Sequence, residues 1–262
     1  MSLAQAALLG ALQGITEFLP ISSSAHLFAI PTLLGWSYAG LAFDVALHWG
    51  TLLALLIAFW RDWWGLVRDA VSRDGALRRA AHIVWLKLAA ASVPAAVAGV
   101  LLQDAAETLL RSLPLQAAML FLFGFLLWWV DRVRPMRAGA LVPGWGSCML
   151  VGAAQALALV PGVSRSGITM TAGRAAGTDR VGAARFAFLL GVPITFGAGL
   201  IELRHLSPGV PLGVLAMGVV SAAVVGIIAI RGLIRWLSGA GFGVFFLYRT
   251  AFAIFILLLS RR

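Results

Sequence analysis

Residues 13–26 read QGITEFLPISSSAH, and residues 155–167 read QALALVPGVSRSG. Each stretch interrupts an apolar segment with a proline, serines and at least one ionisable side chain. The apolar pieces around them, at residues 3–19, 25–36, 147–160 and 166–177, are short for a hydrocarbon core of about 30 Å at about 1.5 Å per helical residue. Irregular backbone at membrane depth survives only inside protein or beside a wet cavity. The two stretches therefore predict two re-entrant helix pairs.

Long apolar runs make up most of the remaining sequence. The 262 residues are 61% hydrophobic and 11% charged, against about 25% charged residues in a typical soluble domain. Runs of about 18 or more apolar residues indicate membrane-spanning helices. Six such spans are predicted, at residues 41–60, 83–102, 115–131, 181–201, 210–230 and 241–259. A basic loop at 61–82 and an acidic link at 103–107 join the first three. The predicted fold class is an all-α polytopic membrane protein.

The two halves of the chain resemble each other. Four polar or small residues recur at an offset of 142, namely Gly10, Gln13, Ser22 and Ser24 as Gly152, Gln155, Ser164 and Ser166. Each half holds a re-entrant helix pair plus three transmembrane helices, and an odd number of crossings inverts the second copy. We predict a single membrane domain over residues 1–262, with a first repeat at 1–131, an inverted second repeat at 147–262 and a cytoplasmic linker at 132–146.

The net charge of +10 raises the question of nucleic-acid binding, which the distribution of the charge argues against. Alternating the predicted spans places twelve of the twenty basic residues on one face: Arg61, Arg68, Arg73, Arg78, Arg79, Lys87, Arg132, Arg134, Arg137, Arg180, Arg231 and Arg235. Four fall on the other face: Arg111, Arg204, Arg261 and Arg262. The last four lie in or near apolar segments: Arg165, Arg174, Arg185 and Arg249.

This asymmetry predicts the orientation in the membrane. Short loops rich in Lys and Arg face the cytoplasm, so the face with twelve basic residues is expected to be cytoplasmic. Both termini then face outward, and the first re-entrant pair enters from outside. The single cysteine, Cys148, excludes an intramolecular disulfide.

Matching breaks in two inverted halves indicate a binding site near the membrane midplane. Among ten acidic residues, only Glu17 and Asp44 lie well inside apolar stretches, and a carboxylate there marks function by default. Ser22, Ser23 and Ser24 are placed to cap the helix that follows them. Since Ser23 and His26 are three residues apart, they can share one face of that helix.

The second break carries the features of an anion site. Ser164 is placed to cap the next helix, whose first turns hold Arg165, Ser166, Gly167 and Thr169. Helix N-termini offer free N–H groups and a positive dipole end, which suit phosphate. Arg165 adds a planar fork for phosphate oxygens. Two such N-termini that meet from opposite sides would bind an anion strongly.

Each feature also has a simpler interpretation. The serines could only cap helices, Arg165 could form a structural ion pair, and His26 could be a satisfied polar residue. Gln13 and Gln155 could be interhelical hydrogen-bonding residues. Three histidines are better explained as interface or loop positions: His48, His82 and His205. The combination of Glu17, the serines, His26 and the mirrored Ser-Arg-Ser-Gly loop favours the functional interpretation.

These motifs resemble a known family. Residues 13–26 are similar to the first signature of the undecaprenyl-diphosphate phosphatases of the BacA type, a Glu/Gln-x-x-x-Glu motif followed by a serine-rich turn and His. Residues 161–167 resemble the second signature, and length, order and hydropathy agree over nearly the whole chain. Two departures stand in the first signature: Gln13 occupies a position where many members carry Glu, and Ser24-Ala25 replaces a common Thr-Gly pair.

The resemblance implies dephosphorylation of a C55 polyprenyl diphosphate to the monophosphate carrier lipid of cell-wall synthesis. It also implies a bacterial inner (plasma) membrane, an outward-facing active site, bacitracin resistance on overproduction, and a divalent cation, Mg²⁺ or Ca²⁺. By the same resemblance the catalytic residues are Glu17, Ser23, His26 and Arg165, with Glu17 as metal ligand. We predict substrate contacts at seven further positions: Gln13, Ser22, Ser24, Ser164, Ser166, Gly167 and Thr169.

Several alternatives stay open. Ser23 could attack with His26 as base, or water activated at Glu17 or His26 could attack directly. Inverted repeats with broken helices are also a transporter architecture, so the chain could be a transporter or flippase of a polyprenyl phosphate lipid. An anion channel is a weaker third possibility. We expect a polyprenyl diphosphate lipid and the membrane as partners and no nucleic acid. Small residues at 210–230 could pack within the chain or in a homodimer.

Overall fold

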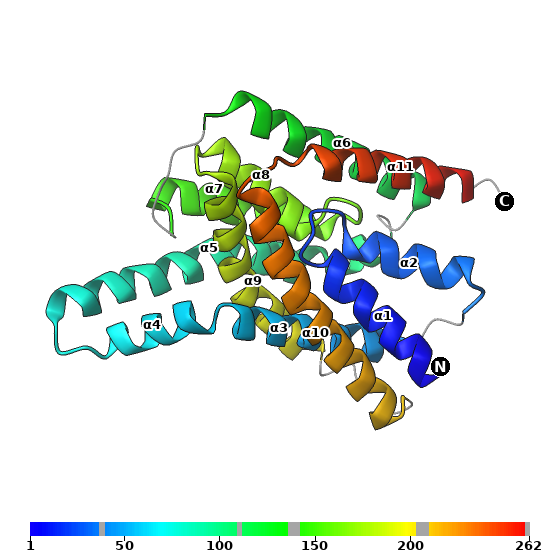
Figure 1. Cartoon of the computed structure of the whole chain (residues 1–262), viewed down its shortest axis with the longest axis horizontal. Coiled ribbons are helices and arrows are strands. Elements are labelled where there is room, and N and C mark those ends of the chain that lie inside the picture. Colours follow the sequence, from blue (N-terminus) through cyan, green and yellow to red (C-terminus); the bar gives the residue numbers. More distant parts are fainter. Residues whose placement is uncertain (37–39, 109–111, 136–141, 203–209, 260–262) are drawn as a thin grey trace.

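The computed structural model describes residues 1–36, 40–108, 112–135, 142–202 and 210–259 (Figure 1). In these ranges the regular elements are helices: α1 (Leu3–Thr16), α2 (Ser23–Leu33), α3 (Leu41–Ala58), α4 (Trp60–Ala70), α5 (Gly75–Thr108), α6 (Leu113–Val133), α7 (Trp145–Gln155), the 3-10 helix η1 (Ala156–Leu159), α8 (Arg165–Ala175), α9 (Arg180–Glu202), α10 (Leu212–Leu237) and α11 (Gly243–Leu259). Six residues used in the charge and histidine arguments lie outside the described residues: Arg111, Arg137, Arg204, His205, Arg261 and Arg262.

Helix lengths confirm a polytopic membrane protein. Within the described ranges, α5, α6, α9 and α10 are each long and apolar enough to cross a membrane. The number of spans rises to five if the pair α3–α4, bent by 70°, is taken as one broken span. The sixth predicted span, α11, is apolar but has 17 residues. The spans predicted at residues 41–60 and 241–259 are therefore helical but short by themselves.

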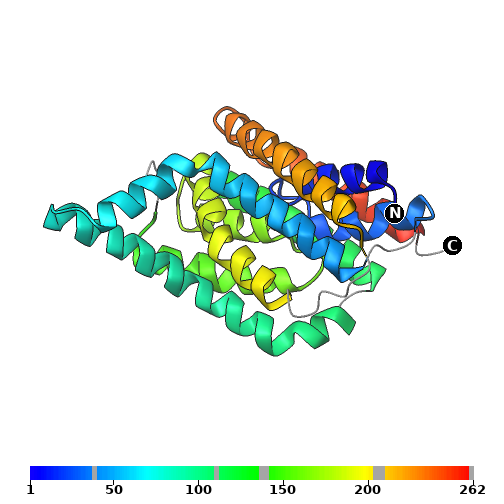
Figure 2. The same ribbon diagram turned by 90° about the horizontal axis from the view of Figure 1, so that it is seen from below.

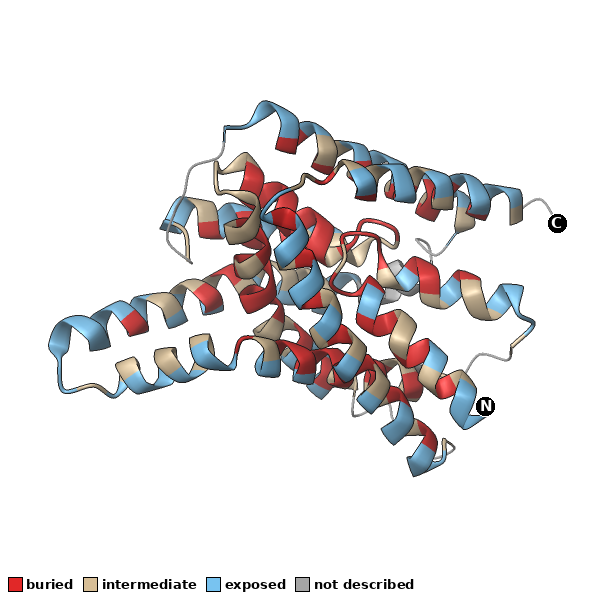
Figure 3. Ribbon diagram, in the orientation of Figure 1, coloured by how far each residue is buried: buried red, intermediate tan, exposed pale blue. Residues whose placement is uncertain are grey.

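Apolar side chains cover the outer surface. Leu101, Leu247 and Ile228 are 74%, 68% and 64% exposed, and many large apolar residues on the outer helices are exposed likewise. Soluble proteins rarely expose contiguous apolar surface on this scale, whereas lipid solvates it. Buried residues gather at the centre, around the two breaks (Figure 3).

Both breaks predicted from the sequence are present. In the first, α1 ends at Thr16 and α2 begins at Ser23, and the N-terminus of α1 and the far end of α2 lie on the same side of the molecule, as in a re-entrant pair (Figure 1). In the second, η1 follows α7 and α8 begins at Arg165. Ser22 and Ser164, which match in the sequence repeat, have φ of 74° and 73°. The equivalent backbone agrees with a repeat, and its inverted orientation and the domain division stay predictions.

Small residues bring the first break against the core. A Cβ added at Gly10 or Gly14 of α1 would overlap the backbone of α10, and one at Gly50 of α3 would overlap the carbonyl of Val219. Lipid tails are as apolar as the helix surfaces, so the hydrophobic effect does not drive helices together in a membrane. Close van der Waals packing between small residues does so instead. The face of α10 that carries small residues therefore packs against α1 and α3 of the same chain. It gives no argument for a homodimer.

Two predicted loops are helical. Residues 61–82 form α4 and the start of α5, and residues 103–107 belong to α5. Residues 61–82 are rich in arginine and also amphipathic, which the prediction of a loop overlooked. Apolar side chains of α4 pack against α5, and the ring centroids of Trp63 and Trp85 are 5.7 Å apart. The α4–α5 hairpin projects from the end of the molecule opposite α1 and the end of α11 in both views (Figure 1, Figure 2).

Outward termini and cytoplasmic arginines stay a prediction, which cysteine labelling tests. On a Cys148→Ser background, an impermeant thiol reagent applied to intact cells should label Ser2→Cys and leave Ser72→Cys unlabelled until the membrane is permeabilised, because residue 72 lies in the basic hairpin. The reverse pattern would overturn the orientation.

Candidate active site

Glu17 lies at the meeting point of the two breaks. It is the C-cap residue of α1, where its backbone N–H donates to the Gln13 carbonyl at 2.9 Å. Its side chain is only 7% exposed. A buried carboxylate requires paired charge and hydrogen bonds to offset its lost hydration, so its neighbours define the site.

Arg165 of the second break supplies the opposite charge. Its Nη2 lies 2.6 Å from Glu17 Oε1, a charge-assisted hydrogen bond between residues 148 positions apart. Gly191 of α9 makes room for the guanidinium, because a Cβ at this position would overlap Arg165 Nη1. The structural ion pair considered from the sequence is thus formed, and it joins the two predicted catalytic residues.

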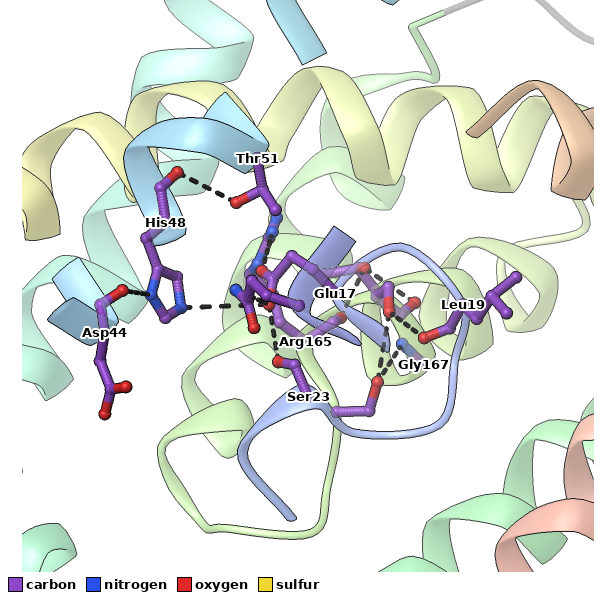
Figure 4. Close-up of polar contacts among 12 residues, drawn as sticks. Glu17, Leu19, Ser23, Asp44, His48, Thr51, Arg165 and Gly167 are labelled. Carbon is purple, nitrogen blue, oxygen red and sulfur yellow. Dashed lines mark hydrogen bonds and ion pairs between the residues drawn. The ribbon is translucent and has the colours of Figure 1, made fainter. Parts of the chain in front are cut away.

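The second carboxylate oxygen accepts hydrogen bonds from Ser23, which Figure 4 shows, and from Gln13. Ser23 Oγ donates to Glu17 Oε2 at 2.7 Å, and Gln13 Nε2 donates to the same oxygen at 3.2 Å. Gln13 Oε1 is buried and has no hydrogen-bond partner among the described residues. A serine hydroxyl aimed at a carboxylate is the arrangement of a nucleophile beside a proton acceptor.

Hydroxyls of the second break shape its loop. Ser164 caps α8 as predicted, accepting from the Gly167 N–H at 3.2 Å. Ser166 Oγ donates to the Leu19 carbonyl at 3.2 Å, which ties the second break to the first. Thr169 Oγ1 donates to the Arg165 carbonyl at 2.8 Å. These residues surround Arg165 and hold its backbone in place.

The predicted serine cap of α2 is absent. Ser22 occupies the N-cap position, yet α2 has no side-chain cap hydrogen bond. The hydroxyls are engaged elsewhere: Ser22 and Ser24 Oγ lie 3.2 Å apart, and Ser23 bonds to Glu17. A cap requires the serine oxygen to accept from a backbone N–H of the first turn, and Ser22 makes no such bond. The first N–H groups of α2 are consequently not covered by a serine side chain.

His26 does not pair with Ser23, contrary to the expected nucleophile–base pair. Its Nδ1 donates to the Ser22 carbonyl at 2.7 Å, and Tyr248 O–H donates to Nε2 of the neutral ring at 2.7 Å. The ring also stacks on Phe252, with centroids 4.0 Å apart. The two side chains diverge because Ser23 is drawn to Glu17 and His26 to α11. In this structure His26 fixes the turn before α2.

Four arginines in apolar segments were noted in the sequence. Three pair with carboxylates: Arg165 with Glu17 at 2.6 Å, Arg174 with Asp131 at 2.9 Å and Arg185 with Asp62 at 2.8 Å. The fourth, Arg249 of α11, is 0% exposed and has no ion-pair partner in the described part of the chain. It must therefore be satisfied by neutral acceptors.

Arg249 bonds to the backbone of both breaks. Nη1 donates to the Pro20 carbonyl at 3.1 Å. Nη2 donates to the Gly162 and Val163 carbonyls at 2.8 and 3.1 Å. Nε donates to the Leu120 carbonyl of α6 at 2.8 Å. One planar guanidinium thus joins the first break, the second break and α6.

His48 was assigned to an interface or loop, and that assignment was wrong. It lies within α3, and its Nε2 is 4.0 Å from Glu17 Oε2. A signal was present in the sequence, because Asp44 and His48 are four residues apart within an apolar helix and so share a face. Only the packing of α3 revealed that this face meets Glu17. His82, by contrast, is an exposed residue, although it lies in helix α5 and not in the expected loop.

Comparison with known proteins gives consistent matches. A family model described as bacitracin resistance protein BacA matches residues 6–255. A protein of Pelotomaculum thermopropionicum named undecaprenyl-diphosphatase is 46% identical over 260 residues, covering 99% of this chain and 97% of the relative. Proteins of the same name from Trichlorobacter lovleyi and Moorella thermoacetica are each 47% identical and cover 99% and 98% of this chain and 97% of each relative.

The role of Arg249 is testable by Arg249→Lys. One ammonium group cannot reach carbonyls on both breaks, so several buried acceptors lose their donors, at about 1–3 kcal/mol each. We expect the stability in detergent to fall by about 3 kcal/mol or more, measured by thermal or denaturant unfolding. Arg235→Lys, at an exposed position of α10, is the matched control. Equal stability of both variants would contradict the proposal that the Arg249 guanidinium holds the two breaks together.

Proposed function

This chain belongs to the bacitracin resistance protein BacA family, and we propose that the cluster of Glu17, Ser23 and Arg165 is where it performs its reaction. It is a multi-pass membrane protein. Like the relatives named undecaprenyl-diphosphatase, it hydrolyses undecaprenyl diphosphate to undecaprenyl phosphate and inorganic phosphate, which returns the carrier lipid to cell-wall synthesis.

One observation carries the assignment of the site: the 2.6 Å ion pair between Arg165 and Glu17, with Ser23 Oγ on the carboxylate's other oxygen at 2.7 Å. The pair places an anion-binding fork beside a nucleophile and its proton acceptor. Among the described residues, Glu17 is the one hydrogen-bond partner of the five N–H donors of Arg165. The others supply donors for phosphate oxygens.

Phosphate binding draws on both breaks. The N-termini of α2 and α8 direct backbone N–H groups and positive dipole ends to this region, and α2 lacks a side-chain cap that would compete. Ser22 and Ser24 border the first N-terminus, and Ser164, Ser166 and Gly167 the second. These five, with Gln13 and with Thr169 as support for the loop, are the proposed substrate-binding residues.

Ser23 is the proposed nucleophile and Glu17 its base. The Oγ–H proton passes to Glu17 Oε2 as Oγ attacks the terminal phosphorus, and the bond to the bridging oxygen breaks. Undecaprenyl phosphate leaves and takes up the proton from Glu17, and a phosphoserine remains for hydrolysis by water. Charge neutralisation by Arg165 and the helix ends stabilises the transition state. His26 acts as a positioning residue that holds the turn bearing Ser23.

A divalent cation, Mg²⁺ or Ca²⁺, fits this site only together with the substrate. Among the described residues, no group of three His, Cys, Asp or Glu could hold an ion. Glu17 and the partnerless, buried Gln13 Oε1 offer oxygen ligands, and Mg²⁺ commonly combines one or two carboxylates with substrate phosphates and water. When bound, the ion would neutralise charge on the diphosphate.

The membrane location, the orientation and the partners of the protein are also proposals. We place the protein in the bacterial inner (plasma) membrane with the active site facing outward, because the basic α4–α5 hairpin lies opposite α1 and the end of α11 (Figure 1) and basic segments face the cytoplasm. The polyprenyl diphosphate lipid is the partner. A homodimer is compatible with the exposed apolar helices.

Purified protein in detergent tests the hydrolase against a carrier. It should release inorganic phosphate from undecaprenyl diphosphate, which a flippase of polyprenyl phosphate would not do. Arg165→Lys should lose activity by about 100-fold or more, because a point charge replaces a planar, bidentate fork. Phosphate release is the measurement, and Arg235→Lys is the control. Near-native hydrolysis by Arg165→Lys would reduce this residue to a general counter-charge.

Ser23→Ala tests the nucleophile. It removes the attacking oxygen and leaves Arg165 in place, so hydrolysis should fall by about 10³-fold or more while affinity for a diphosphate lipid changes little. Glu17→Gln should lose binding as well as turnover, because Arg165 loses its partner and the cation its carboxylate. An acid-stable phosphoenzyme should form in the wild type and be absent from Ser23→Ala, with Ser238→Ala as control. Substantial turnover by Ser23→Ala would assign the attack to water.

A further inference from the structure

His48 presents a hydrogen-bond acceptor to the active site. Its Nδ1 lies 2.8 Å from the backbone carbonyl of Asp44. A carbonyl only accepts, so Nδ1 carries the proton, and Nε2 of the neutral ring has a free lone pair. The His48 side chain is 42% exposed, whereas that of Glu17 is 7% exposed. The His48 ring is therefore reachable from the surface of the protein, whereas the carboxylate 4.0 Å from its Nε2 is buried.

Two acceptors face each other across a gap. His48 Nε2 and Glu17 Oε2 are 4.0 Å apart (Figure 4), which is beyond hydrogen-bond distance. A polar separation of this size suits a bridging water. A water with two hydrogen bonds of about 2.8 Å spans such a gap at an angle of about 90° at its oxygen, not far from tetrahedral. It would donate one proton to each acceptor.

The position of this bridge relates it to the reaction. Glu17 Oε2, one end of the bridge, also accepts from Ser23 Oγ at 2.7 Å, so the bridging position lies beside the nucleophile. A water that donates both protons to Glu17 and His48 directs its oxygen lone pairs away from these two residues, where they are free to attack phosphorus. We infer that His48 Nε2 and Glu17 Oε2 together hold and orient the water that hydrolyses the phosphoserine. The inference rests on Ser23 as nucleophile.

The second half of the reaction then balances without another base. The water oxygen forms a bond to phosphorus as the bond between phosphorus and Ser23 Oγ breaks. One water proton passes to Glu17 Oε2 and from there to Ser23 Oγ, which restores the hydroxyl. Inorganic phosphate leaves with the water oxygen. His48 keeps its Nδ1 proton and undergoes no change of charge, because it only accepts the water's second hydrogen bond.

His48→Leu and His48→Gln test the inference. Leucine removes the acceptor, so the water loses its orientation. Steady-state phosphate release should fall about 10- to 100-fold, while the first turnover, measured as a burst of undecaprenyl phosphate, keeps its wild-type rate. Phosphoenzyme trapped by acid quench from a substrate labelled in the terminal phosphate should accumulate. Glutamine offers a carbonyl oxygen as acceptor, and we expect it to recover most of the lost turnover.

His82→Gln, at an exposed position of α5, is the matched control and should behave as the wild type. The amplitude of the burst also gives the concentration of correctly folded active sites in each variant. Unchanged steady-state release by His48→Leu, or equal slowing of the burst and of the steady state, would overturn the inference. Glutamine no better than leucine would do the same. Failure of the proposed function is distinct, because the wild type itself would then form no phosphoenzyme.

Discussion

The Arg249 guanidinium, buried in the centre of the molecule, is the constraint on which the site depends. Each break leaves backbone carbonyls without helical partners, and in a membrane such groups have no water to bond to. Arg249 satisfies carbonyls from both breaks with one rigid, planar group. Because the fork is planar and its donors are fixed, it sets the distance between Pro20 and Gly162 as well as satisfying them. A side chain 229 residues from Pro20 thus positions the active-site loops.

The ion pair of Glu17 and Arg165 follows from that arrangement. Each charge would be costly by itself at this depth, since a buried ion without a partner loses its hydration. Held together, each offsets the other, and Ser166 adds a direct hydrogen bond between the breaks through the Leu19 carbonyl. The pair leaves most donors of Arg165 for phosphate, and a buried acceptor for the proton of Ser23. One interaction therefore gives both stability and the components of phosphoryl transfer.

The histidines illustrate how spacing and contact differ. Ser23 and His26 have the separation of a nucleophile and base on one helical turn, yet each is drawn to a stronger partner, Glu17 and Tyr248 respectively. For His48 the sequence offers only a helix face shared with Asp44, yet its Nε2 lies 4.0 Å from Glu17 Oε2. Side chains at i and i+3 are neighbours only if no other element offers a better hydrogen bond. Helix α3 carries His48 to Glu17 through close packing against α10, at Gly50.

The sequence by itself determined the membrane class, the two breaks and the residues that meet there. Apolar run length is set by the thickness of the bilayer, and ionisable residues inside such runs are costly enough to mark a site, as Glu17 and Arg165 do. It did not determine that residues 61–82 are helical, that α2 lacks a serine cap, or that Glu17 and not His26 accepts the hydrogen bond from Ser23. Nor did it identify the partners of Arg249 and His48. These depend on which helices pack side by side, and contacts between residues distant in the chain, such as those of Arg249 with Pro20 and Gly162, leave no local pattern. Periodicity and spacing are local, whereas the choice among competing partners for one hydroxyl or guanidinium is made only when tertiary packing sets the distances.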